Sequence, residues 1–143
     1  MKNGVDENTV ITLWQELVGA GYDFTAESRQ TVRVQYAGRP SNAAGADLTD
    51  AVLEIDGQTV TGNIEFHVLA GDWRRHGHDR DKNYNGVALH VVMWRQSGET
   101  TRLENGRLVP TVAIGGFYDN IQQCGLETIP QQFLACHQMA EKS

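Results

Sequence analysis

The chain has 143 residues, enough for one domain with its own hydrophobic core. Its formal net charge of −6 argues against a protein that coats nucleic acid through excess positive charge, although a local basic groove is compatible with it. Only two cysteines are present, Cys124 and Cys136, and they suit neither a disulfide scaffold nor a close metal-ligand pair, so a reducing cytoplasm is the expected location. The N-terminus has no signal-peptide core and no apolar run could cross a bilayer, so no membrane association is expected.

The first half of the chain predicts one helix followed by strands. Apolar residues at helical spacing predict the helix, with Asp6 or Asn8 as its N-cap. Alternating apolar and polar residues predict the strands, and Asp56-Gly57 predicts a two-residue hairpin between the last two. The segment 37–46, rich in glycine and small residues, is expected to be a loop. The expected elements are a helix over 10–18 and strands over 31–36, 51–55 and 59–69.

The second half predicts a short helix, two strands and a terminal helix. Asp72 is a suitable cap for a helix that begins at Trp73, and the following polar run to Asn85 is expected to be an irregular charged connector. His90 interrupts an otherwise apolar strand, where a hydrogen-bonded core histidine is the simplest interpretation. Pro110 favours a sheet edge for the last strand. These later elements are strands over 87–94 and 108–114, a turn at 105–106 and a helix over 129–139.

The order of these elements indicates the α/β (α+β) class, with one mixed central sheet flanked by helices. Residues 1–115 are expected to form the domain. Residues 116–143 are expected to form a helical C-terminal extension, or the start of a region truncated here.

Candidate site residues lie on the strand predicted over 59–69. Because Ile64, Phe66 and Val68 are apolar and side chains alternate along a strand, Glu65 and His67 are expected to share the opposite face. An aspartate on the paired strand would give two converging carboxylates, which suit octahedral Mg²⁺ or Mn²⁺. Such an ion lowers the pKa of a bound water, and His67 would orient that water or ligate the metal.

This αβββαβ order, with Asp heading one strand and Glu-x-Lys on the next, resembles the PD-(D/E)xK, restriction-endonuclease-like nuclease superfamily. Its members cut nucleic-acid phosphodiesters with divalent metal. In that pattern Asp47 matches the first acidic position and Glu65 the second, whereas His67 takes the place of the lysine and Ala46 that of the proline. The resemblance implies a Mg²⁺- or Mn²⁺-dependent nuclease with Asp47, Glu65 and His67 as its catalytic residues and nucleic acid as its partner.

The pairing register bears on the choice of aspartate. A regular hairpin at Asp56-Gly57 would place Asp50, and not Asp47, on the side of Glu65. A β-bulge near Gly62, or a loose entry to the strand around Ala46, would instead place Asp47 on that side. Asp47 is therefore the first choice as metal ligand, through the resemblance, and Asp50 the second.

The blocks YAGRPSNAAGADLTDA, GNIEFHV, DWRRHGHDRD, YNGVALHVV and NGRLVPT, from about residue 36 to 111, are similar to an uncharacterised bacterial family, domain of unknown function 2851. No activity of that family can be carried over. Its members are usually much longer, so the chain is expected to be an N-terminal domain, a short member or a truncated piece.

The charged connector offers two weaker candidate sites. Arg74 and Arg75 are candidates to bind phosphate, but the aspartates around them nearly cancel their charge, so a solvated surface is the simpler interpretation. His76 and His78 are secondary metal candidates. The surrounding HGHDRD resembles the HxHxDH zinc motif, yet Arg80 stands at the position of its aspartate.

Three functions follow from these patterns. The first is a metal-dependent nuclease. The second is a catalytically inactive nuclease fold that acts as a binding or assembly module, and the third is a zinc-dependent hydrolase that uses His76 and His78. The sequence leaves the oligomeric state open, with a homodimer among the alternatives.

Overall fold

Residues 5–41 and 45–117 are described by the structure, a computed structural model. Among these residues are the α-helices α1 (Glu7–Gly19) and α2 (Asp72–Arg75) and the 3-10 helices η1 (His78–Arg80) and η2 (Lys82–Tyr84). The strands are β1 (Phe24–Thr25), β2 (Thr31–Tyr36), β3 (Arg39–Pro40), β4 (Leu48–Ile55), β5 (Gln58–Leu69), β6 (Val87–Trp94), β7 (Thr101–Arg102), β8 (Leu108–Val109) and β9 (Thr111–Ala113).

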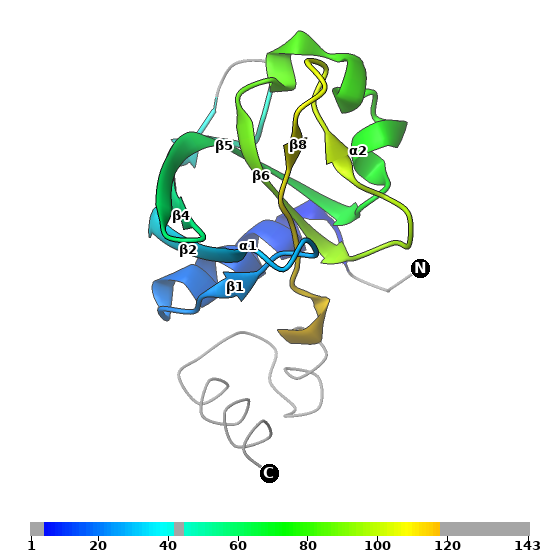
Figure 1. The fold of residues 1–143 in the computed structure, drawn as a ribbon. Coiled ribbons are helices and arrows are strands. Elements are labelled where there is room, and N and C mark those ends of the chain that lie inside the picture. The colour runs from blue at the N-terminus through cyan, green and yellow to red at the C-terminus, as the bar shows by residue number, and fades with distance from the viewer. Residues whose placement is uncertain (1–4, 42–44, 118–143) are drawn as a thin grey trace.

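One mixed sheet organises the domain, in the order β1-β2-β4-β5-β6-β9, with β3 paired to β4. Neighbours are antiparallel as far as β5, whereas β5 pairs with β6, and β6 with β9, in parallel. Figure 1 shows this sheet curling strongly around α1. The predicted α+β class with a mixed sheet is confirmed. The prediction that helices flank the sheet is met only by α1 in the described residues. The connector on the other face contains α2, a single turn, and is otherwise built of 3-10 turns.

Helix α1 covers one face of the sheet. Its N-cap is Asp6, one of the two predicted caps, whose carboxylate accepts the N–H of Thr9 at 2.9 Å in a capping box. The apolar stripe is buried, and Trp14 stacks on Phe24 with ring centroids 4.4 Å apart and meets Phe66 edge-on. The apolar residues of β5 therefore face α1, as the alternation predicts, and the polar residues face the other way.

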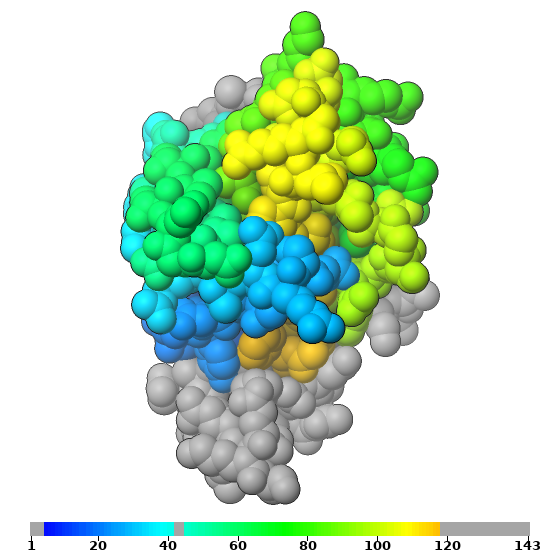
Figure 2. All heavy atoms as spheres, in the orientation of Figure 1, coloured from blue at the N-terminus to red at the C-terminus, as the bar shows by residue number. Residues whose placement is uncertain are grey.

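The connector and the β7–β8 hairpin cover this second face. A small separate core lies there, formed by Ala46, Trp73, Val87, Leu103 and Val109. The indole N–H of Trp73 donates to the carbonyl of Arg102 at 2.8 Å and so joins α2 to β7. In Figure 2 the hairpin, in yellow, lies on the surface between the β4–β5 turn and the connector, both green. Polar residues of β5 are thus enclosed between the sheet and a second layer.

A bulge in β4 decides which aspartate faces Glu65. The hairpin is regular at its turn, where Ile55 pairs with Gln58 as predicted, but the register shifts between Ala51 and Leu48. Asp50 lies in this bulge with a left-handed φ of 59°. Beyond the bulge Leu48 pairs with Ile64, and continuing this antiparallel pairing by one residue places Asp47 opposite Glu65.

A second irregularity lies at the same level in β6. The register there shifts between Asn63–Val87 and Ile64–Leu89, so that His90 lies level with Glu65. Close contact accompanies this shift, since a Cβ atom on Gly62 would lie 2.6 Å from the Cβ of Ala88. Each neighbour of β5 therefore contains one extra residue, and the resulting registers bring Asp47 and His90 level with Glu65.

Most predicted elements are present in the described residues. The helix at 10–18, the predicted strands up to residue 94, the Asp56-Gly57 hairpin and the turn at 105–106 are confirmed within a few residues. The single strand predicted over 108–114 is wrong, because Pro110, which has no N–H, separates β8, paired with β7, from β9, paired with β6 at the edge of the main sheet. Strands β1, β3 and β7, each of two residues, were not predicted. The helix predicted over 129–139 and most of the C-terminal extension lie outside the described residues, and the division at 115 stays a prediction. No helix in the described part of the chain combines the length and apolarity needed to cross a membrane.

Candidate functional site

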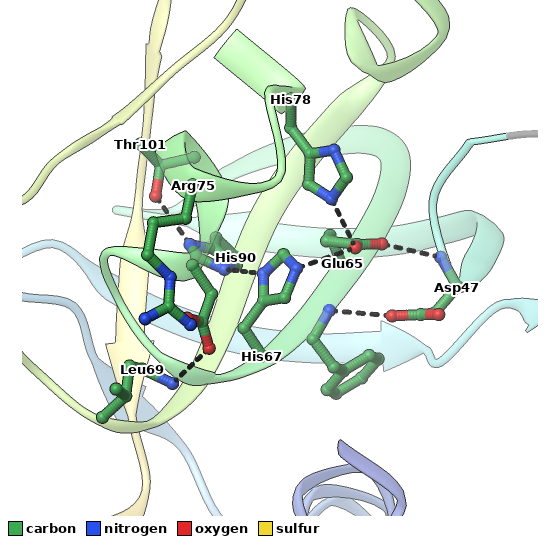
Figure 3. A network of polar contacts seen from close by, with 10 residues as sticks. Asp47, Glu65, His67, Leu69, Arg75, His78, His90 and Thr101 are labelled. Atoms are coloured by element: carbon green, nitrogen blue, oxygen red, sulfur yellow. Dashed lines mark hydrogen bonds and ion pairs between the residues drawn. The ribbon is translucent and has the colours of Figure 1, made fainter. Parts of the chain in front are cut away.

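Glu65 is the centre of a buried polar cluster (Figure 3). Its Oε1 accepts the backbone N–H of Asp47 at 3.1 Å. Its Oε2 lies 3.4 Å from Nε2 of His67 and 3.2 Å from Nε2 of His78. Glu65 is 5% exposed, His67 1% and His78 8%, so three groups that water would normally solvate lie against one another instead.

Asp47 and Glu65 clasp the start of β4 to β5. While Glu65 accepts the N–H of Asp47, the carboxylate of Asp47 accepts the N–H of Phe66 at 3.0 Å. Asp50, the second choice as metal ligand, is exposed on the bulge and pairs with Arg39. The regular register that favoured Asp50 is therefore wrong at this point, because the bulge turns its side chain away from Glu65.

The HGH segment folds back onto β5. Gly77 adopts a left-handed φ of 77°, which reverses the chain between α2 and η1. His78 stacks on Tyr84, with ring centroids 3.8 Å apart, and His76 remains exposed. One nitrogen from each of His67, His76 and His78 lies within 4.8 Å of the others. The expectation of an exposed charged connector is wrong for His78, because the chain reversal at Gly77 buries it against the polar face of β5, whereas His76 is exposed.

A hydrogen-bonded chain leads from His67 across the sheet. Nδ1 of His67 lies 2.8 Å from Nε2 of His90, and Nδ1 of His90 lies 2.8 Å from the hydroxyl of Thr101. The hydroxyls of Thr101 and Thr111 are 2.8 Å apart. His90 is fully buried, so its interpretation as a hydrogen-bonded core histidine is confirmed. Sequence reasoning missed the two threonines, because their contacts depend on the parallel pairing of β6 with β9 and on the β7–β8 hairpin.

Burial sets the protonation of the cluster. It raises the pKa of Glu65 to about 7, and the negative charge of Asp47 acts in the same direction, against a hydrogen bond from His78. Burial likewise lowers the pKa of His67 to about 3 and that of His90 well below its usual value. Near neutral pH both imidazoles are therefore neutral, which is the metal-binding form. With His67 neutral, its short distance to Glu65 is a contact between two polar groups and not an ion pair.

The two arginines proposed to bind phosphate differ in position. Arg75 is the nearer one, since its charge is among the causes that lower the pKa of His67. It pairs with the buried carboxylate of Asp72, which also accepts the N–H of Leu69 at 3.1 Å, and its own side chain is largely exposed. Arg74 pairs with Glu99. Arg75 is thus the better placed for a ligand that approaches the cluster.

The hydroxyl of Thr101 can be tested by substitution. Thr101→Val keeps the shape of the side chain but leaves Nδ1 of the buried His90 without its partner, so the free energy of unfolding is expected to fall by about 1–3 kcal/mol. Thr111→Val is the matched control, because Thr101 still bonds to His90, and about 1 kcal/mol is expected. Urea denaturation measures both values. Equal losses in the two variants would contradict the chain.

The sequence profile described as "Protein of unknown function (DUF2851)" matches residues 7–142. The chain belongs to this family. The DUF2851 match includes the whole cluster, from Asp47 to Thr111. Neither the curated proteins nor the solved structures contain a match to the chain. The site of this DUF2851 domain therefore has to be interpreted from its own chemistry.

Proposed function

We propose that this domain is a divalent-metal-dependent hydrolase that cleaves phosphodiester bonds in nucleic acid, with Asp47, Glu65 and His67 at its centre. The observation that carries the proposal is the buried carboxylate of Glu65, which lies against the imidazoles of His67 and His78 and accepts the backbone N–H of a second acidic residue. Two carboxylates beside imidazole nitrogens are a donor set that divalent metals accept. The sequence pattern favours Mg²⁺ or Mn²⁺ as that metal.

A bound divalent ion would lower the pKa of a water molecule and neutralise charge that develops on the phosphate. In this arrangement Glu65 holds the ion. His67, whose pKa lies near 3, is a poor proton acceptor at neutral pH, so its role is to ligate or to orient the water. The exposed guanidinium of Arg75 is positioned to contact a phosphate oxygen.

The order of the strands supports the nuclease interpretation. An antiparallel meander ending in β5, followed by a parallel neighbour β6, agrees with the αβββαβ resemblance. Asp47 stands opposite Glu65 across the meander, as the two acidic positions of that pattern require. His67 takes the position of the lysine, and a metal-bound or neutral imidazole there replaces a permanent cation.

Asp47 and Asp50 provide a matched test of the proposal. Asp47→Asn can still accept the N–H of Phe66, so the fold should survive, but it removes the charge that faces the site. We expect metal-dependent cleavage of labelled DNA and RNA oligonucleotides to fall at least ~100-fold in kcat/KM. Asp50→Asn, on the same strand but turned away, should stay within about twofold of the wild type. The assay is repeated in Mg²⁺, Mn²⁺, Zn²⁺ and chelator. Absence of cleavage with every metal would refute the hydrolase.

A second function, an inactive binding or assembly module, is favoured by one observation. Both carboxylates accept backbone N–H groups, so Asp47 and Glu65 also act as a structural clasp between β4 and β5. If the clasp is their whole role, the wild type cleaves no oligonucleotide and Asp47→Asn changes stability alone. The assay above separates the two functions.

A further inference from the structure

We infer that the cluster is a zinc-type site, in which Glu65, His67 and His78 hold a tetrahedral transition-metal ion and His76 supplies the fourth ligand. This inference rests on the proposed function in that both use Glu65, but it names a different metal from the one that the sequence pattern favours. It also makes a claim about binding that can be measured without any turnover.

The distances between the ligand atoms fit zinc. Zinc binds histidine nitrogen and carboxylate oxygen at about 2.0–2.2 Å, so two ligands of a tetrahedral ion lie about 3.3–3.6 Å apart. Oε2 of Glu65 lies 3.4 Å from Nε2 of His67 and 3.2 Å from Nε2 of His78. Both distances from Oε2 are therefore close to those between two ligands of one tetrahedral ion.

The fourth position is assigned to His76, the exposed histidine of the cluster. The ligand atoms of the three histidines lie within 4.8 Å of one another, so some contraction is needed. His76 is exposed and follows the last turn of α2, next to Gly77. A small rotation at this chain reversal would bring its imidazole to the ion, while the buried His67 and His78 stay in place.

The kind of donor also discriminates between metals. Mg²⁺ prefers an octahedral shell of oxygen atoms and retains several waters, whereas a site with several imidazoles suits zinc and its neighbours in the transition series. Three of the four proposed ligands here are nitrogen. The carboxylate of Asp47 accepts the N–H of Phe66 and is not one of the four proposed ligands. The backbone N–H of Asp47 donates to Oε1 of Glu65 and so helps to hold Glu65 in place.

The surroundings hold the ligands in the orientation that binding requires. A ligating histidine usually donates its other N–H to a partner, which fixes the ring. If Nε2 of His67 binds the metal, its Nδ1–H donates to His90, His90 donates to Thr101, and Thr101 donates to Thr111. Every N–H and O–H along this chain then has an acceptor, apart from the rotatable last hydroxyl.

His78 is oriented by packing. Its ring lies between Tyr84, stacked at 3.8 Å and 19°, and Trp73, edge-on at 5.2 Å, with Nε2 directed at Glu65. This packing suggests a variant that removes the ligand and keeps the contacts. In His78→Phe the ring can still stack on Tyr84, but no nitrogen faces Glu65.

The test measures metal binding to the full, untagged chain after chelator treatment. Calorimetric titration with Zn²⁺ is expected to show one tight site per chain, and Co²⁺ is expected to give the visible absorption of a tetrahedral complex. His78→Phe should weaken Zn²⁺ binding at least ~100-fold, and Asp50→Asn, away from the cluster, should bind as the wild type does. His67→Asn is a second variant, since its amide can replace Nδ1 toward His90 while no atom replaces Nε2. Unfolding midpoints in chelator establish that each variant is folded.

The outcomes are distinct. Zn²⁺ binding that is lost in His78→Phe and His67→Asn supports the site. Absence of Zn²⁺ binding, binding that both variants retain, or tighter binding of Mg²⁺ than of Zn²⁺ overturns it. Cleavage of nucleic acid with Mg²⁺ and no Zn²⁺ binding would leave the hydrolase standing without this metal. Zn²⁺ binding without any cleavage would leave the metal site standing without the hydrolase.

Discussion

Replacing Glu65 with glutamine is expected to lower kcat/KM for metal-dependent cleavage at least ~10³-fold, equivalent to about 4 kcal/mol of transition-state stabilisation. The amide has the shape of the carboxylate and can still accept the N–H of Asp47 at Oε1. It cannot give the metal a negative ligand between His67 and His78. Single-turnover cleavage of a labelled oligonucleotide, at saturating metal, measures the loss.

Glu54→Gln is the matched control for this variant. Glu54 lies on β4, near the hairpin turn and away from the cluster, and its substitution removes the same charge from the protein. We expect cleavage by Glu54→Gln to remain within about twofold of the wild type. A Glu65→Gln protein that cleaves as fast as Glu54→Gln would show that Glu65 has no part in the reaction.

The stability of the metal-free protein is expected to respond to pH in opposite directions when Glu65 or His67 is removed. The pKa of Glu65 is raised from 4.5 to about 7, so its contribution to stability is complete below pH 4.5 and is lost as the pH rises through 7. The pKa of His67 is lowered from 6.5 to about 3, so its contribution is complete above pH 6.5 and is lost as the pH falls. In the wild type the two effects offset each other.

In each variant one of the two groups is left to titrate, so its effect on the free energy of unfolding can be measured separately. Between pH 7 and 4.5, Glu65→Gln should lose about 3 kcal/mol more stability than the wild type, and His67→Asn about 3 kcal/mol less. His90, whose pKa is also lowered by burial, adds an acid-side loss that the wild type and both variants share. Urea denaturation in chelator at several pH values gives the curves. If the free energy of unfolding depended on pH in the same way in both variants, burial would not shift the pKa of Glu65 and His67 in opposite directions.

Local patterns in the sequence predicted the elements that carry the site. Alternation along residues 59–69 placed Glu65 and His67 on one face, and in β5 both faces are buried at this point, with Phe66 in the core against α1 and Glu65 and His67 in the polar cluster. Asp56-Gly57 predicted the hairpin, because few other residue pairs allow the positive φ angles of such a turn. These features depend on near neighbours in the chain, and the sequence contains that information.

The assembly of the cluster depends on contacts between distant segments. No local signal predicts that β5 and β6 pair in parallel, or that His90 lies level with Glu65. The sequence left open a regular register, a bulge near Gly62 or a loose entry around Ala46, and the observed bulge lies at Asp50 on the partner strand. The sequence does not reveal this position, because aspartate tolerates a left-handed φ but does not require one. The positions of His76 and His78 were not predicted, because a glycine at position 77 allows the chain to reverse but does not indicate the direction that it then takes.

The two irregularities beside β5 affect how related sequences should be aligned. The bulge in β4 makes the separation between Asp47 and Glu65 18 residues. A family member whose β4 is straight would need its aspartate one position nearer to the glutamate to occupy the same place in space. Likewise, a β6 without the extra residue near Ala88 would need its histidine shifted by one. A relative that lacks the extra residue in β4 or β6 therefore keeps the site only if the alignment contains a gap of one residue there. If the same relative aligns without a gap, its matching aspartate or histidine occupies a different place in the structure.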